Sequence, residues 1–311
     1  MTTARAAAPI QGTAALQGQV RTIDWRRLLP RTVLHASIIA LVILWILPTF
    51  GLLISSFRHA SDISSTGWWT VFRTPLDFTK YTLENYDAVI NNPNYDMGRA
   101  FLNSLIIALP ATIAPLFFAA SAAYAFAWMQ FPGRNVLFVI LVGMLIVPLQ
   151  LTFIPVLRLF NNVGITNNDS FPYLGIWIAH TAYGLPYAIY LLRNYMGSLP
   201  REIFESAFLD GCSNRTAFFR LALPLSVPAI ASLVIFQFLW VWNDLLVALI
   251  YVGGGRYAPL TYALSGLVNS LGQDWQLLTA AAFVSMFLPL IVFLGLQRYF
   301  VRGLLAGSVK G

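Results

Sequence analysis

The chain has 311 residues, of which 58% are hydrophobic and 10% are charged, and its formal net charge is +7. A soluble globular domain carries about 25% charged residues, so the composition excludes an ordinary soluble protein and predicts one whose main solvent is lipid. The three histidines lie far apart, and Cys212 is the single cysteine. This excludes an intramolecular disulfide, and no ligand spacing for zinc or iron is present. The basic residues form no cluster with aromatic residues of the kind that binds nucleic acid.

Six apolar runs are long enough to cross a bilayer as helices, because a crossing takes roughly 20 helical residues. They lack the alternating pattern of membrane strands, which need only about 10 residues. We therefore predict an all-α membrane protein with six transmembrane helices. The runs are residues 33–57, 102–128, 136–157, 173–192, 225–252 and 277–296.

The predicted transmembrane domain, 33–302, lies between two tails. Residues 1–32 are rich in Ala, Gln and Gly and then basic, and we predict a cytoplasmic tail without a packed domain. The first run is too long for a signal-peptide core of about 7–15 residues, so we expect it to be retained. With this orientation, thirteen of the 19 Lys and Arg residues fall on inner segments. The positive-inside rule then places both termini, including the short tail 303–311, in the cytoplasm.

The segment between the first two runs, residues 58–100, is too long for a simple turn. We expect it outside the membrane, with its aromatic residues at the membrane–water interface, where such residues gather. The aromatic residues that carry this expectation are Trp68, Trp69, Tyr86 and Tyr95.

Residues 193–224, between the fourth and fifth runs, form a compact polar module. Pro200 suits a first helical turn, where its missing N–H costs nothing, and Glu205 follows near the helix N-terminus, where negative charge is favoured. Gly211 suits a left-handed helix end, after which Ser213 or Asn214 starts a second helix. The first helix carries one apolar face, formed by Ile203, Phe204, Ala207 and Phe208.

A short exposed amphipathic helix of this kind has two sensible uses. It lies in lipid headgroups if its polar face is rich in Lys and Arg, or it fits a groove on a partner protein. The polar face here carries Glu202, Glu205 and Asp210, which anionic lipid repels. We therefore favour a partner protein.

The module resembles the cytoplasmic loop shared by membrane subunits of ATP-binding-cassette (ABC) importers. That loop reads Glu-Ala-Ala, three residues, Gly, nine residues, and Ile-x-Leu-Pro. This chain has Glu205-Ser206-Ala207, then Gly211, then Leu221-Ala222-Leu223-Pro224, with Ser206 and Leu221 as the two departures. Further stretches resemble the sugar-importer branch, the MalG-like subunit of maltose permeases: LENYDAVI, VPLQLTFIP, GLPYAIYLLRNYM, WVWNDLLVAL and GLLAGSVKG.

The resemblance implies a type I ABC importer permease that forms half of a sugar path in the cytoplasmic membrane of a prokaryote. The implied partners are a second homologous permease, two cytoplasmic ATPase subunits that bind the ATP and Mg, and an extracytoplasmic sugar-binding protein that docks partly on 58–100. The chain itself is then no enzyme and binds no cofactor or metal. Residues 198–212 become the coupling helix. The implied ATPase-coupling residues are Glu205, Ser206, Ala207, Asp210, Gly211, Leu221, Leu223 and Pro224.

Polar and aromatic residues inside the fourth and fifth runs are candidates for the sugar path, because polar groups are costly in lipid. Gln237 falls near mid-membrane, where contact with sugar and an interhelical hydrogen bond are both open. Pro186 predicts a kink beside aromatic residues that suit sugar rings or a helix core alike. His180 is expected to be a hydrogen-bonded structural residue. The path candidates are Tyr183, Tyr187, Gln237, Trp240, Asn243 and Asp244, the last two suiting an outer gate or a binding-protein contact.

The C-terminal tail is short, and its glycines predict little tendency to form a helix. The resemblance places it between the two ATPase subunits; the alternative is a frayed chain end. The residues concerned are Gly303, Leu304, Gly307 and Lys310.

Two rival classes are weaker on the sequence. An ion-coupled secondary transporter needs intramembrane acids and an internal repeat, whereas Asp244 is the only acid in any run and no repeat is visible. A membrane enzyme needs a catalytic constellation, and GGGRYAPL lacks the Lys-Ser/Thr of a phosphate loop. Within the importer family, another small polar solute is the alternative to a sugar.

Overall fold

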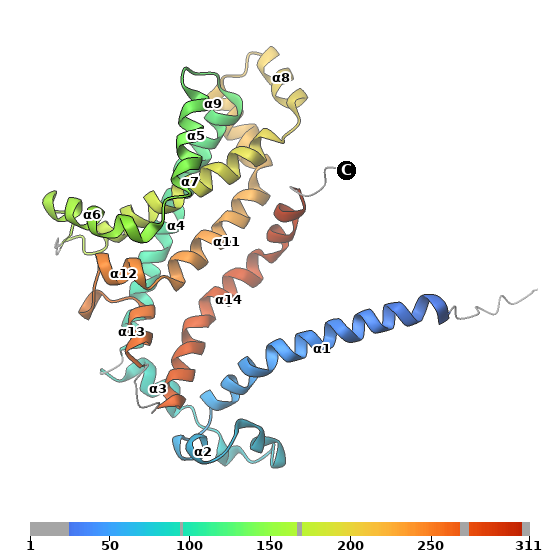
Figure 1. Ribbon diagram of the computed structural model, residues 1–311, viewed down its shortest axis with the longest axis vertical. Coiled ribbons are helices and arrows are strands. Elements are labelled where there is room, and N and C mark those ends of the chain that lie inside the picture. Colours follow the sequence, from blue (N-terminus) through green and yellow to red (C-terminus); the bar gives the residue numbers. More distant parts are fainter. Residues whose placement is uncertain (1–24, 94–95, 167–169, 268–273, 307–311) are drawn as a thin grey trace, which may run out of the picture. The chain divides into compact units, whose positions relative to one another are not determined.

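The computed structural model describes residues 25–93, 96–166, 170–267 and 274–306. Within these ranges the chain is helical, with one isolated antiparallel bridge between Arg58 and Tyr81 and no strand, which confirms the predicted all-α class (Figure 1). The α-helices are α1 (Trp25–Ser56), α2 (Ala60–Ser65), α3 (Glu84–Asn91), α4 (Met97–Trp128), α5 (Arg134–Met144), α6 (Leu149–Asn162), α7 (Leu174–Gly197), α8 (Arg201–Leu209), α9 (Asn214–Ala217), α10 (Leu223–Leu225), α11 (Val227–Asn243), α12 (Leu246–Tyr251), α13 (Leu260–Leu267) and α14 (Trp275–Ala306). A π-helical turn, Phe218–Ala222, and the short 3-10 helices Trp68–Arg73, Phe78–Lys80 and Gly255–Tyr257 complete them.

The chain separates into two compact units, residues 1–50 and residues 51–311. The described part of the first unit is the stretch of α1 that ends at Phe50, and its side chains from Thr32 onward are exposed. The apolar stretch Thr32–Ser56 has the length and hydropathy of a membrane span. It coincides with the first predicted run.

The second unit is built around α4, which packs most extensively against α7 and also against α11 (Figure 1). The buried face of α4 is lined by alanines, and small residues let helices approach closely in a membrane. Helix α11 packs in turn against α14. The fully buried alanines of α4 are Ala108, Ala111, Ala119 and Ala123.

The predicted crossings are only partly continuous helices. Among the described helices, α1, α4 and α14 are long and apolar enough to cross a membrane unaided, and two bent pairs would raise the number from three to five. Helices α5 and α6, which share the third predicted run, meet at 103°, so that run is not one straight helix. Pro148 directly precedes α6, and the residue before a proline is driven out of helical conformation. The count of six crossings stays a prediction.

Helix α14 continues to Ala306, beyond the predicted end of the sixth run at residue 296. The expectation of little helical tendency is therefore wrong for Gly303 and Leu304, because a long helix already in progress needs only propagation and no new nucleus. Gly307 and Lys310 lie outside the described residues.

Candidate functional site

Helix α8, Arg201–Leu209, lies in the predicted polar module and is three residues shorter at each end than the predicted coupling helix, 198–212. Pro200 directly precedes the helix with φ −57° and ψ 124°, one position earlier than the predicted first turn. Glu202 occupies the first turn. Glu205 therefore lies in the second turn, farther from the positive helix end than the sequence suggested.

The turn after α8 is a Schellman motif centred on Gly211. Its φ of +81° is left-handed, as predicted. The Gly211 N–H donates to the Phe208 carbonyl at 3.0 Å, and the Cys212 N–H donates to the Ala207 carbonyl at 2.9 Å, which is the hydrogen-bond pair that defines the motif. The Ser213 hydroxyl then accepts from the Thr216 N–H at 3.3 Å and caps α9. Gly211 thus reverses the chain within a few residues.

Phe204 anchors α8 to the rest of the second unit. Its side chain is fully buried, and its ring stacks on that of Trp128 with centroids 3.9 Å apart and planes inclined by 20°. The Trp128 Nε1 donates to the Met196 carbonyl in the last turn of α7 at 3.1 Å. The predicted apolar face is therefore divided, because Phe204 faces its own chain.

The rest of α8 presents a mixed apolar and acidic surface to the outside. Leu209 is 89% exposed, and Ile203 and Phe208 are also exposed. Glu205 is exposed as well, and no described side chain pairs with it. We define the coupling surface as these four residues. Ser206, Asp210 and Gly211 are exposed beside it, whereas Ala207 is half-buried.

The end of the loop motif coincides with an irregular stretch of helix. Leu221 lies in the π-helical turn, and the Leu223 N–H donates to the Phe218 carbonyl, five residues back. Leu221 and Leu223 are half-buried and Pro224 is exposed. The segment Asn214–Leu225 then meets α11 at an angle of 71°. The motif thus connects α8 to α11 through a bend.

Gln237 lies where α4, α7 and α11 meet. It is 7% exposed, and its Nε2 donates to the Ala111 carbonyl at 3.2 Å. A Cβ on Gly184 of α7 would lie 2.7 Å from the Gln237 amide, so this glycine lets the amide fit. Of the two alternatives for Gln237, the structure shows the interhelical hydrogen bond.

Tyr183 and Tyr187 flank Pro186 on α7 but differ in their surroundings. The Tyr183 hydroxyl lies 2.8 Å from that of Tyr251 and accepts from the Thr152 hydroxyl at 3.1 Å. It therefore ties α7 to α12 and α6. The Tyr187 side chain is 46% exposed, so of the two rings it is the accessible one.

Asp244 caps helix α12. Its Oδ2 accepts from the Val247 N–H at 2.9 Å and from the Ala248 N–H at 3.3 Å, and its carbonyl accepts from the Thr261 hydroxyl at 2.9 Å. The neighbouring Asn243 is exposed, and its amide donates to the Leu239 carbonyl within α11 at 2.8 Å. Both polar groups thus stabilise the point where α11 ends.

His180 lies close to Asp244 in a cavity of about 10 Å³. Its Nε2 is 3.9 Å from the Asp244 Oδ2, its side chain is 1% exposed, and Trp240 lies edge-on at 5.2 Å. Neither ring nitrogen has a hydrogen-bond partner in the described part of the chain. The expectation of a hydrogen-bonded His180 is wrong, because the Asp244 carboxylate accepts from α12 and the Ser104 hydroxyl in the same cavity accepts from the Leu260 N–H.

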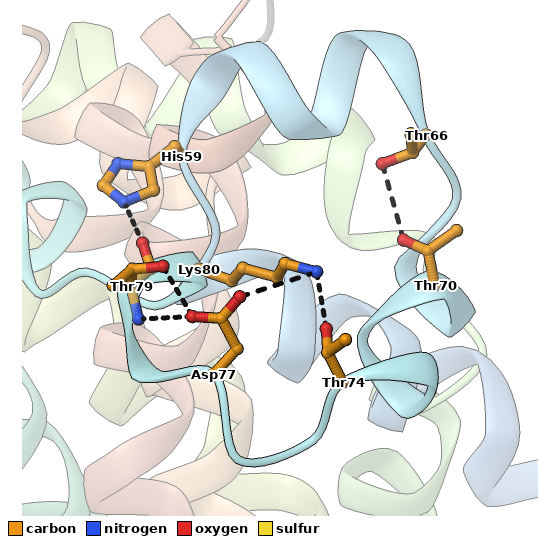
Figure 2. A network of polar contacts seen from close by, with 7 residues as sticks. All are labelled: His59, Thr66, Thr70, Thr74, Asp77, Thr79 and Lys80. Atoms are coloured by element: carbon orange, nitrogen blue, oxygen red, sulfur yellow. Dashed lines mark hydrogen bonds and ion pairs between the residues drawn. The ribbon is translucent and has the colours of Figure 1, made fainter.

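The segment between α1 and α4 has a local polar network (Figure 2). The Asp77 Oδ1 accepts from the Thr79 hydroxyl at 2.6 Å and the Thr79 N–H at 3.3 Å, and its Oδ2 lies 3.8 Å from Lys80 Nζ. The hydrogen bond from the Thr79 side chain lowers the pKa of Asp77. His59 Nε2 lies 3.2 Å from the Thr79 carbonyl. The segment is therefore an ordered surface.

Arg58, which was not among the predicted site residues, organises the same segment. Its side chain is 3% exposed and donates to the carbonyls of Thr66 and Asp62 at 3.2 and 3.0 Å. Asn85 donates to the Arg58 carbonyl at 2.9 Å. The only sequence signal was its position directly after an apolar run.

Comparison with known proteins identifies the fold and the family. Residues 116–305 match the family described as binding-protein-dependent transport system inner membrane component. The chain is 56% identical over 291 residues to the osmoprotective compounds uptake permease protein GgtD of Synechocystis sp., covering 93% of this chain and 94% of the relative. It is 43% identical over 368 residues to the alpha-glucoside transport system permease protein AglG of Rhizobium meliloti, covering 89% and 96%. A chain from the crystal structure of a bacterial ABC transporter involved in the import of the acidic polysaccharide alginate superposes with a TM-score of 0.71 at 19% identity, covering 90% of this chain and 99% of that one.

Proposed function

The chain belongs to the family of binding-protein-dependent transport system inner membrane components, and from this membership we propose that it is the permease of an ABC importer for sugars or sugar-like solutes. As a member of that family it is a membrane subunit and not an enzyme, and ATP hydrolysis belongs to a separate ATPase. Membership also removes the ion-coupled transporter and the membrane enzyme as alternatives. The observation that carries the proposal is the motif from Glu205 to Pro224, folded as an exposed helix, a Schellman turn and a bend into α11.

For the solute, we propose a neutral α-glucoside or a small osmoprotective compound. The relatives named for these solutes share 43% and 56% of their residues with this chain. The six predicted runs contain no Lys or Arg, so the membrane part offers no positive charge to an acidic polysaccharide, and burying an unpaired negative charge is costly. Exposed Tyr187 and half-buried Trp240 supply aromatic faces for a sugar ring. Asn243 and Asp244 would line the outer gate.

The proposed assembly contains a second homologous permease, two ATPase subunits with their ATP and Mg, and an extracytoplasmic binding protein. The chain would cross the membrane six times, with residues 1–32 and 303–311 in the cytoplasm. The segment 58–100 would then face the binding protein. The tail 303–311, with Gly303, Leu304, Gly307 and Lys310, would lie between the ATPase subunits.

In this assembly the coupling surface of α8 is seated in a groove of one ATPase. Ile203, Phe208 and Leu209 supply the apolar contact, and Glu205 pairs with a basic residue of the ATPase. Phe204 transmits the motion, because its stacking on Trp128 joins α8 to α4. ATPase closure then displaces α8 and rocks the helices between two arrangements.

The test is substitution of Glu205 in the reconstituted transporter, with Glu202→Ala as the matched control on the same helix. Loss of a charge-assisted contact at Glu205→Ala should weaken docking by roughly 10- to 150-fold, and uptake and solute-stimulated ATP hydrolysis should fall together. Glu202→Ala should leave both near wild type. Normal coupling in Glu205→Ala would contradict the role of the coupling surface.

A second experiment addresses the tail. Removing residues 307–311 leaves the described length of α14 intact, so any effect reports on the tail alone. Coupled ATP hydrolysis should fall while insertion is unchanged. Full coupling in the shortened chain would show that the tail is a dispensable chain end.

A further inference from the structure

Prolines lie inside several helices of the second unit, among them Pro155 of α6 and Pro186 of α7, and three interrupt the hydrogen-bond ladders of α4 and α14. Pro110 and Pro115 lie inside α4, and Pro289 lies inside α14. Proline has no backbone N–H, so the carbonyl four residues earlier loses its helical donor. The carbonyls released in this way belong to Ile106, Ala111 and Ser285.

Each of these three carbonyls accepts a hydrogen bond from a side chain of a neighbouring helix. One donor comes from α7 and two come from α11. The bonds are Trp177 Nε1 to Ile106 O at 3.0 Å, Gln237 Nε2 to Ala111 O at 3.2 Å, and Trp242 Nε1 to Ser285 O at 3.0 Å.

These bonds stand in for missing helical bonds. Gln237 is 7% exposed and Trp242 is 3% exposed, whereas the bond of Trp177 lies at an exposed site; in the hydrocarbon layer no water reaches these carbonyls to satisfy them. A donor from the next helix is then the available substitute. Because each released carbonyl has a fixed position along its helix, each bond also fixes the position of the neighbouring helix along that axis.

We infer that Trp177, Gln237 and Trp242 are positioning residues that hold α4, α7, α11 and α14 in a single register. Helix α11 carries two of the three donors, one toward α4 and one toward α14, and is the shared member. The inference deepens the proposed transport function and rests on it for its consequence: the four helices move as one body when α8 is displaced, with the flexing left to the bend before α11.

The main competing role is that Gln237 binds the solute. The amide is enclosed on three sides, by the Ala111 carbonyl of α4, by Gly184 of α7 and by its own helix α11. A Cβ at Gly184 would come within 2.7 Å of the amide oxygen as well as the nitrogen. The amide therefore fills a junction between helices, as a positioning residue does.

The decisive experiment restores the missing N–H. In the purified assembled transporter, Gln237→Met removes the donor and keeps the side-chain length, whereas Pro115→Ala supplies a backbone N–H four residues after Ala111. We expect Gln237→Met to lower the melting temperature by about 2–4 °C and the double variant to recover most of that loss. Pro115→Ala alone should change it little, because the carbonyl keeps a donor in either case.

The other two pairs provide matched controls. Pro110→Ala should rescue Trp177→Phe, and Pro289→Ala should rescue Trp242→Phe. Neither substitution should rescue Gln237→Met, because each proline releases a different carbonyl. If these bonds fix the register, each proline substitution rescues only the variant of its own pair. Rescue by proline substitutions from other pairs, or no rescue at all, would overturn the inference.

Transport kinetics separate positioning from solute binding. Gln237→Met should lower the maximal uptake rate with the solute KM unchanged, and Pro115→Ala should restore the rate. A KM that stays raised in the double variant would assign Gln237 to the solute path and overturn its positioning role. If Gln237→Met prevents assembly, recovery of the assembled complex by Pro115→Ala becomes the readout, and failure to recover counts against the inference. The melting temperatures need no solute, so a transporter that carries neither α-glucosides nor osmoprotective compounds while showing matched rescue would refute only the proposed function.

Discussion

The rings of Phe204 and Trp128 lie 3.9 Å apart and are inclined by 20°, which makes one aromatic stack the link between α8 and the end of α4. The stack is closed on its other side by the hydrogen bond from Trp128 to the Met196 carbonyl. Displacement of α8 therefore acts first on α4 and α7, which are the two helices in most extensive contact in the second unit.

The first prediction separates the anchor of α8 from its exposed surface. Phe204→Ala removes a fully buried ring, a change that costs about 3–5 kcal/mol in a protein core, and should leave α8 detached and open to proteolysis. Leu209→Ala, at a side chain that is 89% exposed, should leave protease resistance unchanged and weaken ATPase docking. Equal protease sensitivity of the two variants would show that Phe204 is not the anchor.

The second prediction concerns the left-handed turn at Gly211. No atom lies within 4 Å of a Cβ built there, so a substitution is limited by its φ of +81° alone. Gly211→Asn should be near wild type, because Asn tolerates this conformation, and Gly211→Ala should cost about 1–2 kcal/mol. Gly211→Pro should abolish coupling, since it removes the N–H that donates to Phe208. Coupled ATP hydrolysis measures the order, and Asn performing worse than Ala would contradict it.

The third prediction distinguishes capping from charge at Asp244. Asp244→Asn keeps an oxygen that accepts from Val247 and Ala248, whereas Asp244→Ala leaves both N–H groups without that acceptor. Loss of such a cap costs about 0.5–2 kcal/mol. Transport and melting temperature should follow the order wild type, Asn, Ala. If Asn and Ala are equally impaired, the negative charge matters and the cap does not.

The fourth prediction is a pH dependence in the segment between α1 and α4. The hydrogen bond from Thr79 lowers the pKa of Asp77 below its ordinary value of 3.8. Its contribution to local stability is therefore present above pH 3.8 and is lost as the pH falls through the lower folded value. Carbon-13 titration of the Asp77 carboxyl should show a midpoint below 3.8 that rises in Thr79→Val. An unchanged midpoint in that variant would assign the shift to another neighbour.

The polar module was the most predictable part of the molecule, because its determinants are local. Gly211 specifies a left-handed turn from its own chemistry, and the polar spacing around Glu205 specifies a short exposed helix. Phe204 was predicted on the surface for a partner, but it is buried against its own chain. This burial depends on Trp128, which is far away in the sequence and belongs to another helix.

The membrane helices show where sequence patterns lose information. Hydropathy is high on both sides of Pro148, so the run reads as continuous, and it carries no record of the 103° bend. The positions of the prolines in α4 identify, from sequence alone, which backbone carbonyls lack a helical hydrogen-bond donor. Only the packing of the helices shows that Trp177 and Gln237 supply the donors.

The π-helical turn Phe218–Ala222 affects how this part of the chain tolerates the loss of a residue. Its hydrogen bond from Leu223 to Phe218 encloses one residue more than an α-turn. Loss of one residue from this turn converts it to ordinary α-helix, and α9 and α11 keep their present facing. A one-residue deletion within this turn should therefore leave both flanking helices folded, even though it shortens the nine-residue spacing of the loop motif.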